Sequence, residues 1–483
     1  MSANLLSGAL IVVAMRWSDR AIGLVSTMVL ARLLVPEDFG IVAMASLVVG
    51  LVDVVLDLGV AAALIHRGQC DHEDYSSAWT IRLIQAAIAG SIIAALAPFA
   101  GDFYHDPRVT PVLLLMAVTT LAGGLENIGI VMFQKDMTFG KDFQFFFLRR
   151  CAGFVATLAL AWYFRSYWAL PLGALVGRLF GVALSYLIHP FRPRLTLSRL
   201  GSIWSFSQWM LVRSIGAYAD ARLDKILVGR RFDATTTGSY SLADEISAMP
   251  TTELLAPLGR VLFPAFVSAR DKGEDLKRIF LLSIGLQTAV ALPAAAGLAL
   301  VAGDAVRLLL GERWVSAIPF IQILSLIYGI TSIVHAAGYL MMTLGKTRLM
   351  AIFMWGQVAA FVLVVFLPIA SESAINIAVL RLLVTATAAA MFLLMLTRII
   401  PTLSMGNLLS AIWRPLLATG IMAALLLTMP PLEMNAAARL TLTSLTGALI
   451  YSASLMALWW LSGRPGGGEA YLLGKLKGIL ARR

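Results

Sequence analysis

The chain contains about fourteen apolar stretches, each long enough to cross a lipid bilayer. A spanning helix needs roughly 20 consecutive, mostly apolar residues. Apolar residues make up 59% of the sequence and charged residues only 13%, with a mean hydropathy of +0.84. An ordinary soluble domain carries roughly 25% charged residues. The sequence therefore predicts an all-α, polytopic membrane protein.

The predicted spans leave only short connections between them, too short to fold as a soluble catalytic domain. Because the number of spans is even, both termini lie on one side of the membrane. The two sets of alternate loops hold roughly 18 and 6 Lys and Arg residues, which predicts cytoplasmic termini. We place the spans at residues 8–34, 40–65, 77–100, 109–133, 144–164, 167–188, 204–229, 237–267, 279–301, 314–343, 349–368, 374–396, 407–429 and 438–461.

A short motif is repeated at a spacing of 198 residues. Ala31–Leu34, followed by Gly40, is matched by Gly229–Phe232, followed by Gly238. Six predicted helices separate the two copies, so both copies run through the membrane in the same direction. This arrangement is typical of transporters that are built from two parallel repeats.

The repeat predicts three regions along the chain. Two six-helix lobes are expected at residues 1–200 and 201–400. Residues 401–483 then hold helices 13 and 14 and a basic tail. This tail is either an amphipathic helix on the inner leaflet or a solvated end, and the pattern favours neither.

Several predicted spans carry charged residues, which are costly inside a bilayer unless they face a polar cavity or a partner. Helices 1, 2, 7 and 8 hold most of them, so we expect these helices to line a hydrated central cavity. Arginines there are always charged, and their paired donors match phosphate or diphosphate oxygens. The predicted substrate-binding residues are Arg16, Arg20, Arg213 and Arg260. The predicted coupling or cavity-lining acids are Asp53, Asp57, Asp220, Asp224 and Glu253.

Helical spacing places many of these side chains on common faces. The two arginines of helix 1 and the two aspartates of helix 2 are each one turn apart. On helix 7, Arg213, Asp220 and Asp224 lie within about 20° of one line at 100° per residue. The aspartates of helix 2 have two open interpretations: they neutralise arginines of a neighbouring helix, or they exchange a coupling cation.

A second set of arginines has a structural interpretation that needs no ligand. We place these residues near helix ends, where long basic side chains reach the membrane surface or anchor a leaflet. They are Arg82, Arg149, Arg150 and Arg178.

The sequence gives little support for a metal site, an enzyme active site or a nucleic-acid interface. His66, Cys70 and His72 share a loop, but their spacing fits no zinc pattern, and we predict neither a metal nor a cofactor. P-loop, GxSxG and HExxH motifs are missing, which argues against an enzyme. The net charge of +11 is spread over short loops, so nucleic acid is not an expected partner.

Three stretches resemble a known family. Arg20–Leu34, followed by Pro36-Glu37-Asp38-Phe39-Gly40, is similar to the opening of bacterial polysaccharide flippases. Phe133–Lys135 with Phe139, and Leu344–Thr347, resemble the cytoplasmic turns of the same family. These flippases are the Wzx-type members of the multidrug/oligosaccharidyl-lipid/polysaccharide exporter superfamily. The likeness covers nearly the whole chain in length, helix count and lobe plan.

The resemblance implies a fold, an activity and partners. The fold would be two six-helix lobes around a cavity that opens alternately to each side of the bacterial inner membrane. The activity would be transfer of undecaprenyl-diphosphate-linked oligosaccharide to the outer leaflet for O-antigen, capsule or exopolysaccharide assembly. Membrane lipids, a polysaccharide polymerase and a chain-length protein would be partners. Ser26-Thr27 replace an Arg-Asp pair of the related lipid II flippase, which points away from peptidoglycan precursors.

Two other functions remain as alternatives. A cation-coupled drug exporter of the same superfamily should have a more apolar or acidic cavity and usually twelve helices. A membrane polyprenyl-dependent glycosyltransferase or ligase should carry a sizeable outer loop with catalytic groups, whereas the predicted outer loops, such as 101–108 and 302–313, are short.

Overall fold

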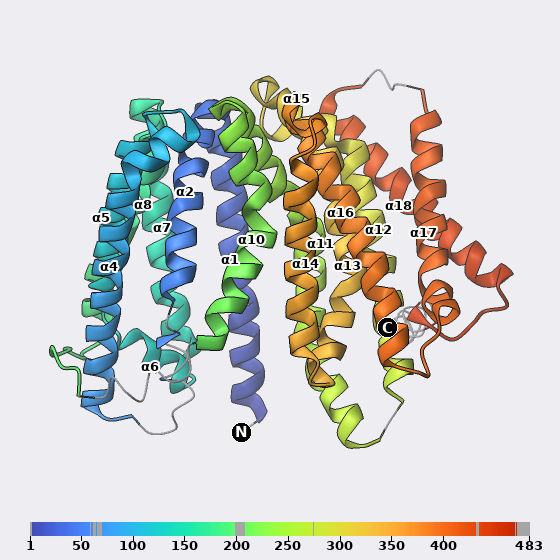
Figure 1. Cartoon of the computed structure of the whole chain (residues 1–483), viewed down its shortest axis with the longest axis horizontal. Coiled ribbons are helices and arrows are strands. Elements are labelled where there is room, and N and C mark those ends of the chain that lie inside the picture. Colours follow the sequence, from blue (N-terminus) through green and yellow to red (C-terminus); the bar gives the residue numbers. More distant parts are fainter. Residues whose placement is uncertain are drawn as a thin grey trace. The chain divides into compact units, whose positions relative to one another are not determined.

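The computed structural model describes residues 2–57, 59–60, 64, 70–198, 208–273, 275–430, 434–468 and 470. All of the long secondary-structure elements in these ranges are helices (Figure 1). The side chains of residues 2–14, 208–213, 256–257 and 260 lie outside this description. Within the described ranges, fourteen helices have sixteen residues or more. They are α1 (Ser2–Leu33), α2 (Pro36–Leu56), α4 (His72–Tyr104), α5 (Val109–Gly124), α7 (Phe139–Phe164), α8 (Ala169–Ile188), α10 (Gln208–Arg231), α11 (Ala234–Asp271), α12 (Leu276–Leu309), α13 (Ile318–Thr343), α14 (Thr347–Val365), α16 (Ala374–Ile399), α17 (Met405–Thr428) and α18 (Ala436–Leu461).

These helices confirm the predicted all-α, polytopic membrane fold. Each of the fourteen predicted spans overlaps one long helix. Ten of the helices that the structure describes are long and apolar enough to cross a membrane, and α5 is a shorter apolar helix. The remaining short elements are α6 (Ile130–Lys135), α15 (Ile369–Glu372) and the 3-10 helix η1 (Glu312–Ala317).

Two predicted spans are not continuous. The predicted span 40–65 is interrupted, because α2 stops at Leu56 and Asp57 is the cap residue that follows it, while Val60 and Leu64 are again helical. Two polar groups stabilise this end: Gln85 Nε2 donates to the carbonyl oxygen of Leu56 at 2.5 Å, and the backbone N–H of Gly59 donates to Asp57 Oδ1 at 2.9 Å. Gly59 has a φ of 62°, which a glycine adopts without strain.

The predicted span 109–133 is also not continuous. The structure divides it into α5 and α6, with residues 125–129 between them. Non-helical backbone is tolerated at membrane depth when protein groups satisfy its hydrogen bonds. The break therefore places Glu126 on an irregular segment instead of a helix face.

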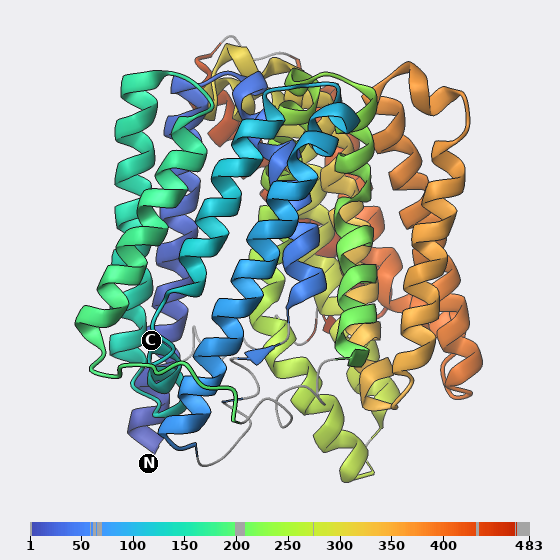
Figure 2. The same cartoon turned by 60° about the vertical axis from the view of Figure 1, so that its left-hand side comes forward.

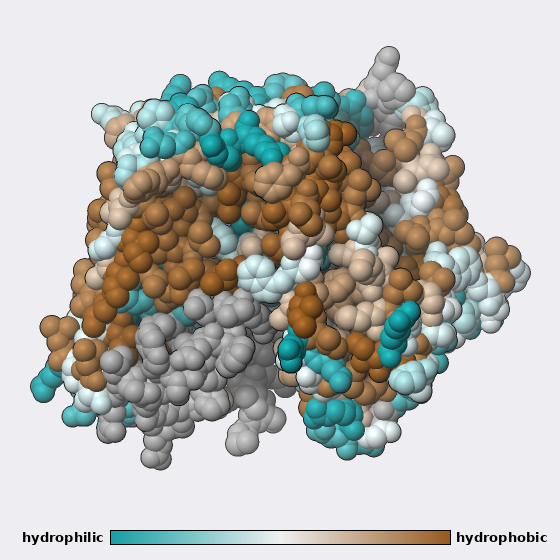
Figure 3. Space-filling view, in the orientation of Figure 1, coloured by the Kyte–Doolittle hydropathy of each residue, from teal (hydrophilic) through white to brown (hydrophobic). Residues whose placement is uncertain are grey.

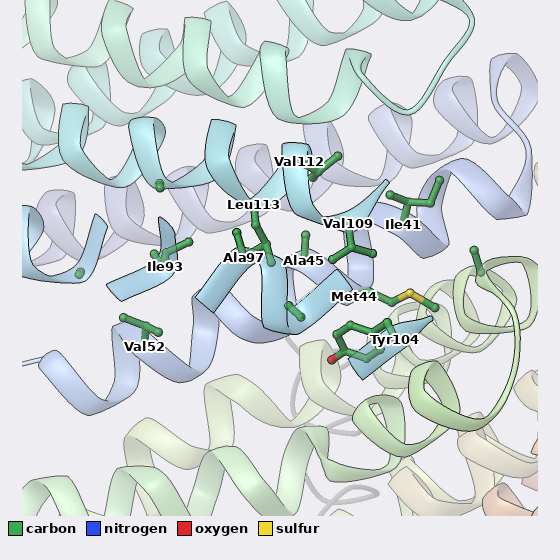
Figure 4. Close-up of a cluster of buried hydrophobic side chains, with 14 residues drawn as sticks. Ile41, Met44, Ala45, Val52, Ile93, Ala97, Tyr104, Val109, Val112 and Leu113 are labelled. Carbon is green, nitrogen blue, oxygen red and sulfur yellow. The ribbon is translucent and has the colours of Figure 1, made fainter. Parts of the chain in front are cut away.

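The chain forms two compact units, Met1–Gly238 and Ser239–Arg483. The first unit contains α1 to α10 and the first residues of α11. Its main apolar core joins α2, α4 and α5, through residues such as Ala45, Ile93 and Leu113 (Figure 4). An apolar core of the second unit joins α12, α13, α16 and α17 with part of α11, around buried Phe280 and Met341.

The outward faces of the helices suit contact with lipid tails. In the first unit, apolar side chains cover the middle of the visible helices, while hydrophilic residues gather at the helix ends (Figure 3). Large apolar side chains near the middle of α5, α7 and α8 are strongly exposed, among them Val118, Val155 and Leu179 at 50%, 62% and 49%. Exposed apolar belts of this kind are expected when lipid replaces water around the protein.

Small residues allow α7 and α8 to pack closely, and the two helices run side by side in the first unit (Figure 2). Gly173, Gly177 and Gly181 recur every fourth residue along α8, and all three are buried. A Cβ on Gly177 would lie 2.8 Å from the Cα of Gly153 on α7. Small residues at this spacing let two membrane helices approach through their backbones.

We expect Gly173→Val to separate these helices. A Cβ at this position would lie 2.6 Å from the Cα of Thr157, which is backbone that cannot turn away. Overpacking of this kind costs about 1–3 kcal/mol, so the thermal unfolding temperature of the purified protein should fall. Gly140→Ala is the control, because nothing lies within 4 Å of a Cβ there. An unchanged unfolding temperature for Gly173→Val would contradict the close packing.

The start of α11 crosses α2 at two glycines, within the first unit. A Cβ on Gly40 would overlap the carbonyl oxygen of Ala234, and a Cβ on Gly238 would overlap that of Pro36. Ala234 and Gly238 follow Pro36 and Gly40 at the spacing of 198 residues noted in the sequence. The contact is therefore reciprocal, as in a pair of elements related by a twofold rotation.

α10 packs against α2 and α4 in the same unit. The hydroxyl of Tyr218 donates to the carbonyl oxygen of Leu47 at 2.5 Å. Nearer the end of α10, a Cβ on Gly229 would lie 2.9 Å from the ring of Tyr104. These contacts explain why α10 belongs to the first compact unit.

Candidate functional site: a charged cavity in the first unit

A cavity of about 440 Å³ lies within the first unit, among α2, α4, α5, α6, α7 and α8. Among the described residues, six ionisable side chains contribute to its wall, three basic and three acidic. They are Arg82, Arg149, Arg178, Asp53, Asp57 and Glu126. Ionisable groups between membrane helices are rare and usually functional, so this cavity is the candidate site.

Three guanidinium groups converge on one carboxylate in this cavity. Arg149 Nη1 lies 2.9 Å from Glu126 Oε2, and Arg82 Nη2 lies 3.4 Å from Glu126 Oε1. Arg178 Nη1 is more distant, at 3.9 Å from Glu126 Oε2. The Glu126 side chain is only 7% exposed, whereas the three arginine side chains are 28–36% exposed. The carboxylate is therefore buried behind the cations.

The break between α5 and α6 holds Glu126 in place. The side chain of the next residue, Asn127, is fully buried and donates to the carbonyl oxygen of Phe191 at 2.8 Å. Its backbone N–H donates to Ser185 Oγ of α8 at 3.0 Å, and its side-chain oxygen accepts from the N–H of Gly129 at 2.9 Å. These bonds replace the helical ones that the break removes, as required away from water.

His189, which follows α8, supports the same segment. Its Nδ1 accepts a hydrogen bond from the N–H of Phe191 at 3.1 Å. Burial, and to a lesser extent the charge of Lys141, lower the pKa of His189. A lowered pKa favours the neutral imidazole, which is the form that can accept this bond.

Glycines and aromatic rings position the arginines. A Cβ on Gly181 would collide with the side chain of Arg149, and one on Gly123 would lie 3.3 Å from the guanidinium carbon of Arg178. The guanidinium carbon of Arg149 also lies 5.5 Å and 5.1 Å from the ring centres of Phe145 and Phe146. Cation–π contacts at this range are stabilising, and they orient Arg149 toward Glu126.

The acids of α2 contribute to the same cavity. Asp53 lies one turn before the end of α2, and Asp57 lies just after it. Both side chains are exposed, and both line the cavity together with Gln85. The structure thus brings two predicted site residues together with three arginines that the sequence analysis did not assign to a site.

The helix-end interpretation is wrong for three of the four arginines to which we applied it. Arg82, Arg149 and Arg178 lie inside α4, α7 and α8, and each approaches Glu126. Arg150 differs, because its Nε lies 3.2 Å from Asp19 Oδ1 and both side chains are more than half exposed. Glu126 is the residue that could have revealed this grouping from the sequence, because a buried carboxylate in a membrane needs cationic partners.

The other predicted site residues whose side chains the structure describes do not line this cavity. On α1, Arg16 is half-buried and Arg20 is exposed. On α10, Asp220 is exposed and Asp224 is buried. Glu253 is half-buried on α11, in the second unit. The backbone positions of Arg213 and Arg260 lie on α10 and α11, but their side chains are outside the described residues.

Comparison with known proteins identifies the family. The pattern of the family described as polysaccharide biosynthesis protein matches residues 29–319, which is more than half of the chain. The chain belongs to this family. The match includes every residue of the charged cavity, so the cavity lies in the part of the chain that defines membership.

The chain is also similar to curated proteins of bacteria. It is 27% identical over 331 residues to the lipopolysaccharide biosynthesis protein WzxC of Escherichia coli (strain K12), covering 66% of each chain, just under two thirds. It is 26% identical to the succinoglycan biosynthesis transport protein ExoT of Rhizobium meliloti (strain 1021), covering 63% of this chain and 62% of ExoT. It is 22% identical to the teichuronic acid biosynthesis protein TuaB of Bacillus subtilis (strain 168), covering 82% and 84%.

Solved structures show the same fold at low sequence identity. The lipid II flippase MurJ, in an inward closed conformation, has a TM-score of 0.73 at 10% identity, covering 93% of this chain and 99% of MurJ. An inward-facing multidrug resistance transporter of the MATE family has a TM-score of 0.59 at 16% identity, covering 79% and 94%. These likenesses show the fold of the chain, which is the fold that the resemblance in the sequence implies.

Proposed function

We propose that this protein is a flippase that moves undecaprenyl-diphosphate-linked oligosaccharide from the inner to the outer leaflet of a bacterial inner membrane, for O-antigen or exopolysaccharide assembly. The observation that carries the proposal is a polar, arginine-rich cavity between membrane helices in a member of the polysaccharide biosynthesis family. A head group of diphosphate and sugars needs polar partners within the protein as it crosses, because each unpaired polar group costs several kcal/mol in hydrocarbon.

The diphosphate is received, in this proposal, by the cations predicted from the sequence: Arg16, Arg20, Arg213 and Arg260. The acids Asp53, Asp57, Asp220, Asp224 and Glu253 release or exchange a cation during the cycle. The prenyl tail stays in lipid while the head group crosses within the protein. Both termini lie in the cytoplasm, and a polymerase and a chain-length protein act on the product.

In this proposal, transport occurs by alternating access, in which the two lobes move so that the cavity opens to one side of the membrane at a time. The two six-helix lobes, 1–200 and 201–400, are related by the repeat, and the reciprocal contact at Gly40 and Gly238 supports such a relation. The compact units divide later, at residue 238, because α10 packs on α2 and α4. Opening of one side then requires α10 and the start of α11 to separate from α2.

Deletion of the gene tests the function. Surface polysaccharide should disappear and the lipid-linked oligosaccharide should accumulate facing the cytoplasm, and a plasmid copy should restore export. Arg20→Ala and Arg213→Ala should each lower export about tenfold or more, since a hydrogen bond to a charged group contributes about 1.5–3 kcal/mol.

Arg150→Ala is the matched control for these substitutions, because Arg150 makes an exposed ion pair with Asp19. Exposed pairs contribute little to stability, so export should stay near the wild-type level. Normal export by Arg20→Ala and Arg213→Ala at normal protein level would overturn the binding assignment. Increased drug sensitivity of the deletion strain, with intact surface polysaccharide, would favour a drug exporter instead.

A further inference from the structure

We propose that the charged cavity of the first unit is a subsite for one acidic sugar, which it recognises through a single anionic group such as the carboxylate of a uronic acid. The inference rests on the proposed function and deepens it, because it names a chemical property of the transported oligosaccharide. It also gives a role to three arginines outside the predicted diphosphate site.

The arginines retain donors for a ligand. A guanidinium group has five N–H donors, and each of the three arginines directs one terminal nitrogen toward Glu126. Glu126 is buried behind them, whereas about a third of each arginine side chain is exposed. The remaining donors therefore line the cavity, where paired N–H groups match the two oxygens of a carboxylate.

The size of the cavity limits the ligand to one small group. Its volume of about 440 Å³ lies in the lower part of the range for small-molecule sites, about 300–1,000 Å³. One sugar ring with its anionic substituent fits this range, and a whole oligosaccharide does not. The remaining sugars would lie outside the cavity.

The charge distribution favours an acidic sugar over a diphosphate. Asp53 and Asp57 line the cavity together with the arginines, and Gln85 lies beside them. Carboxylates accept hydrogen bonds from hydroxyl groups, so they suit the neutral part of a sugar. They repel any anion, but they repel a diphosphate, which carries more negative charge, more strongly than a single carboxylate.

Glu126 acts as an internal anion that competes with the ligand. It accepts a hydrogen bond from Arg149 and one from Arg82, and it neutralises part of the charge of all three guanidinium groups. Removal of its charge should therefore strengthen anion binding, whereas removal of an arginine should weaken it. A purely structural ion network would not give these opposite effects on a ligand.

The test uses the full-length protein purified in detergent, with binding followed by thermal shift. The probes are glucuronate, glucose, inorganic phosphate and farnesyl diphosphate, each compared with sodium chloride at equal ionic strength. Glucuronate should stabilise the wild-type protein and glucose should not. Arg178→Gln should weaken glucuronate binding about tenfold, and it is the mildest arginine change because Arg178 is the most distant from Glu126, at 3.9 Å.

Two further variants complete the comparison. Glu126→Gln should bind glucuronate more tightly than wild type, and Arg150→Gln, which alters an exposed ion pair outside the cavity, should bind it equally. The inference is overturned if glucuronate has no effect, if its effect survives Arg178→Gln, or if farnesyl diphosphate or phosphate binds the cavity more tightly. Failure here with intact rescue of polysaccharide export by the wild-type gene would leave the proposed function standing. Failure of that rescue would overturn the proposed function itself.

Discussion

Gly238→Val should strongly destabilise the first unit and abolish polysaccharide export. A Cβ at Gly238 would overlap the carbonyl oxygen of Pro36 and would lie 2.8 Å from the backbone nitrogen of Gly40. Both neighbours are backbone atoms, so no side chain can turn away, and the helices must separate. We expect a cost of about 3 kcal/mol, at the upper end of values for overpacking. Thermal unfolding of the purified protein and an export assay measure the two effects.

Two controls sharpen this prediction. Gly297→Ala changes a glycine within α12 where nothing lies within 4 Å of a Cβ, so stability should be unchanged or slightly higher. Gly40→Val should resemble Gly238→Val, because the contact is reciprocal. The double variant should cost less than the sum of the single ones, since both break the same contact. Wild-type stability and export for Gly238→Val would rule out the close crossing of α2 and α11.

Glu126→Gln is the second change with a large expected effect. It leaves three guanidinium groups around a neutral amide, so their mutual repulsion is no longer compensated. Removal of one partner from a buried ion pair costs about 3–5 kcal/mol. The arginines are about a third exposed, so we expect a smaller cost, about 2 kcal/mol. The thermal unfolding temperature in detergent should fall, and added glucuronate should restore part of the loss.

The control for Glu126→Gln is the same substitution at Glu37. Glu37 Oε1 lies 2.7 Å from Arg108 Nη1, but both side chains are more than 40% exposed. Exposed ion pairs contribute about 0–1 kcal/mol, so this variant should unfold near the wild-type temperature. Equal effects of the two substitutions would show that burial behind the arginines gives Glu126 no special importance.

The helices were largely predictable from the sequence because hydropathy is a local property. Every predicted span overlaps a long helix, and the errors fall where polar residues interrupt an apolar run. Apolar residues continue beyond Asp57, yet α2 ends at Leu56. The helix can end at this point because Gln85 of another helix donates a hydrogen bond to the carbonyl group of Leu56. The break before α6 likewise depends on Ser185 and Phe191, which are distant in sequence.

The candidate site was only partly predictable. Asp53 and Asp57 were recognised as charges within an apolar segment, and both line the cavity. Arg82, Arg149 and Arg178 were assigned to helix ends, because distance along the chain was the only measure of depth. Their common partner is 44 residues from Arg82 and 23 residues from Arg149. Contacts at such separations depend on how helices rotate and pack, which hydropathy does not encode.

The amino-acid sequence was enough to establish the class of this protein, because a chain with this many long apolar segments must satisfy its backbone as helices within a bilayer. The internal repeat could also be recognised from the sequence, because residues 31–40 and 229–238 match at a spacing of 198 residues. Which charges meet depends on the packing of the helices, since the grouping of three arginines around Glu126 requires α4, α7, α8 and the break after α5 to pack together. The same packing decided that Gly40 and Gly238 face one another, because close backbone approach is a property of two helices in contact and not of either alone.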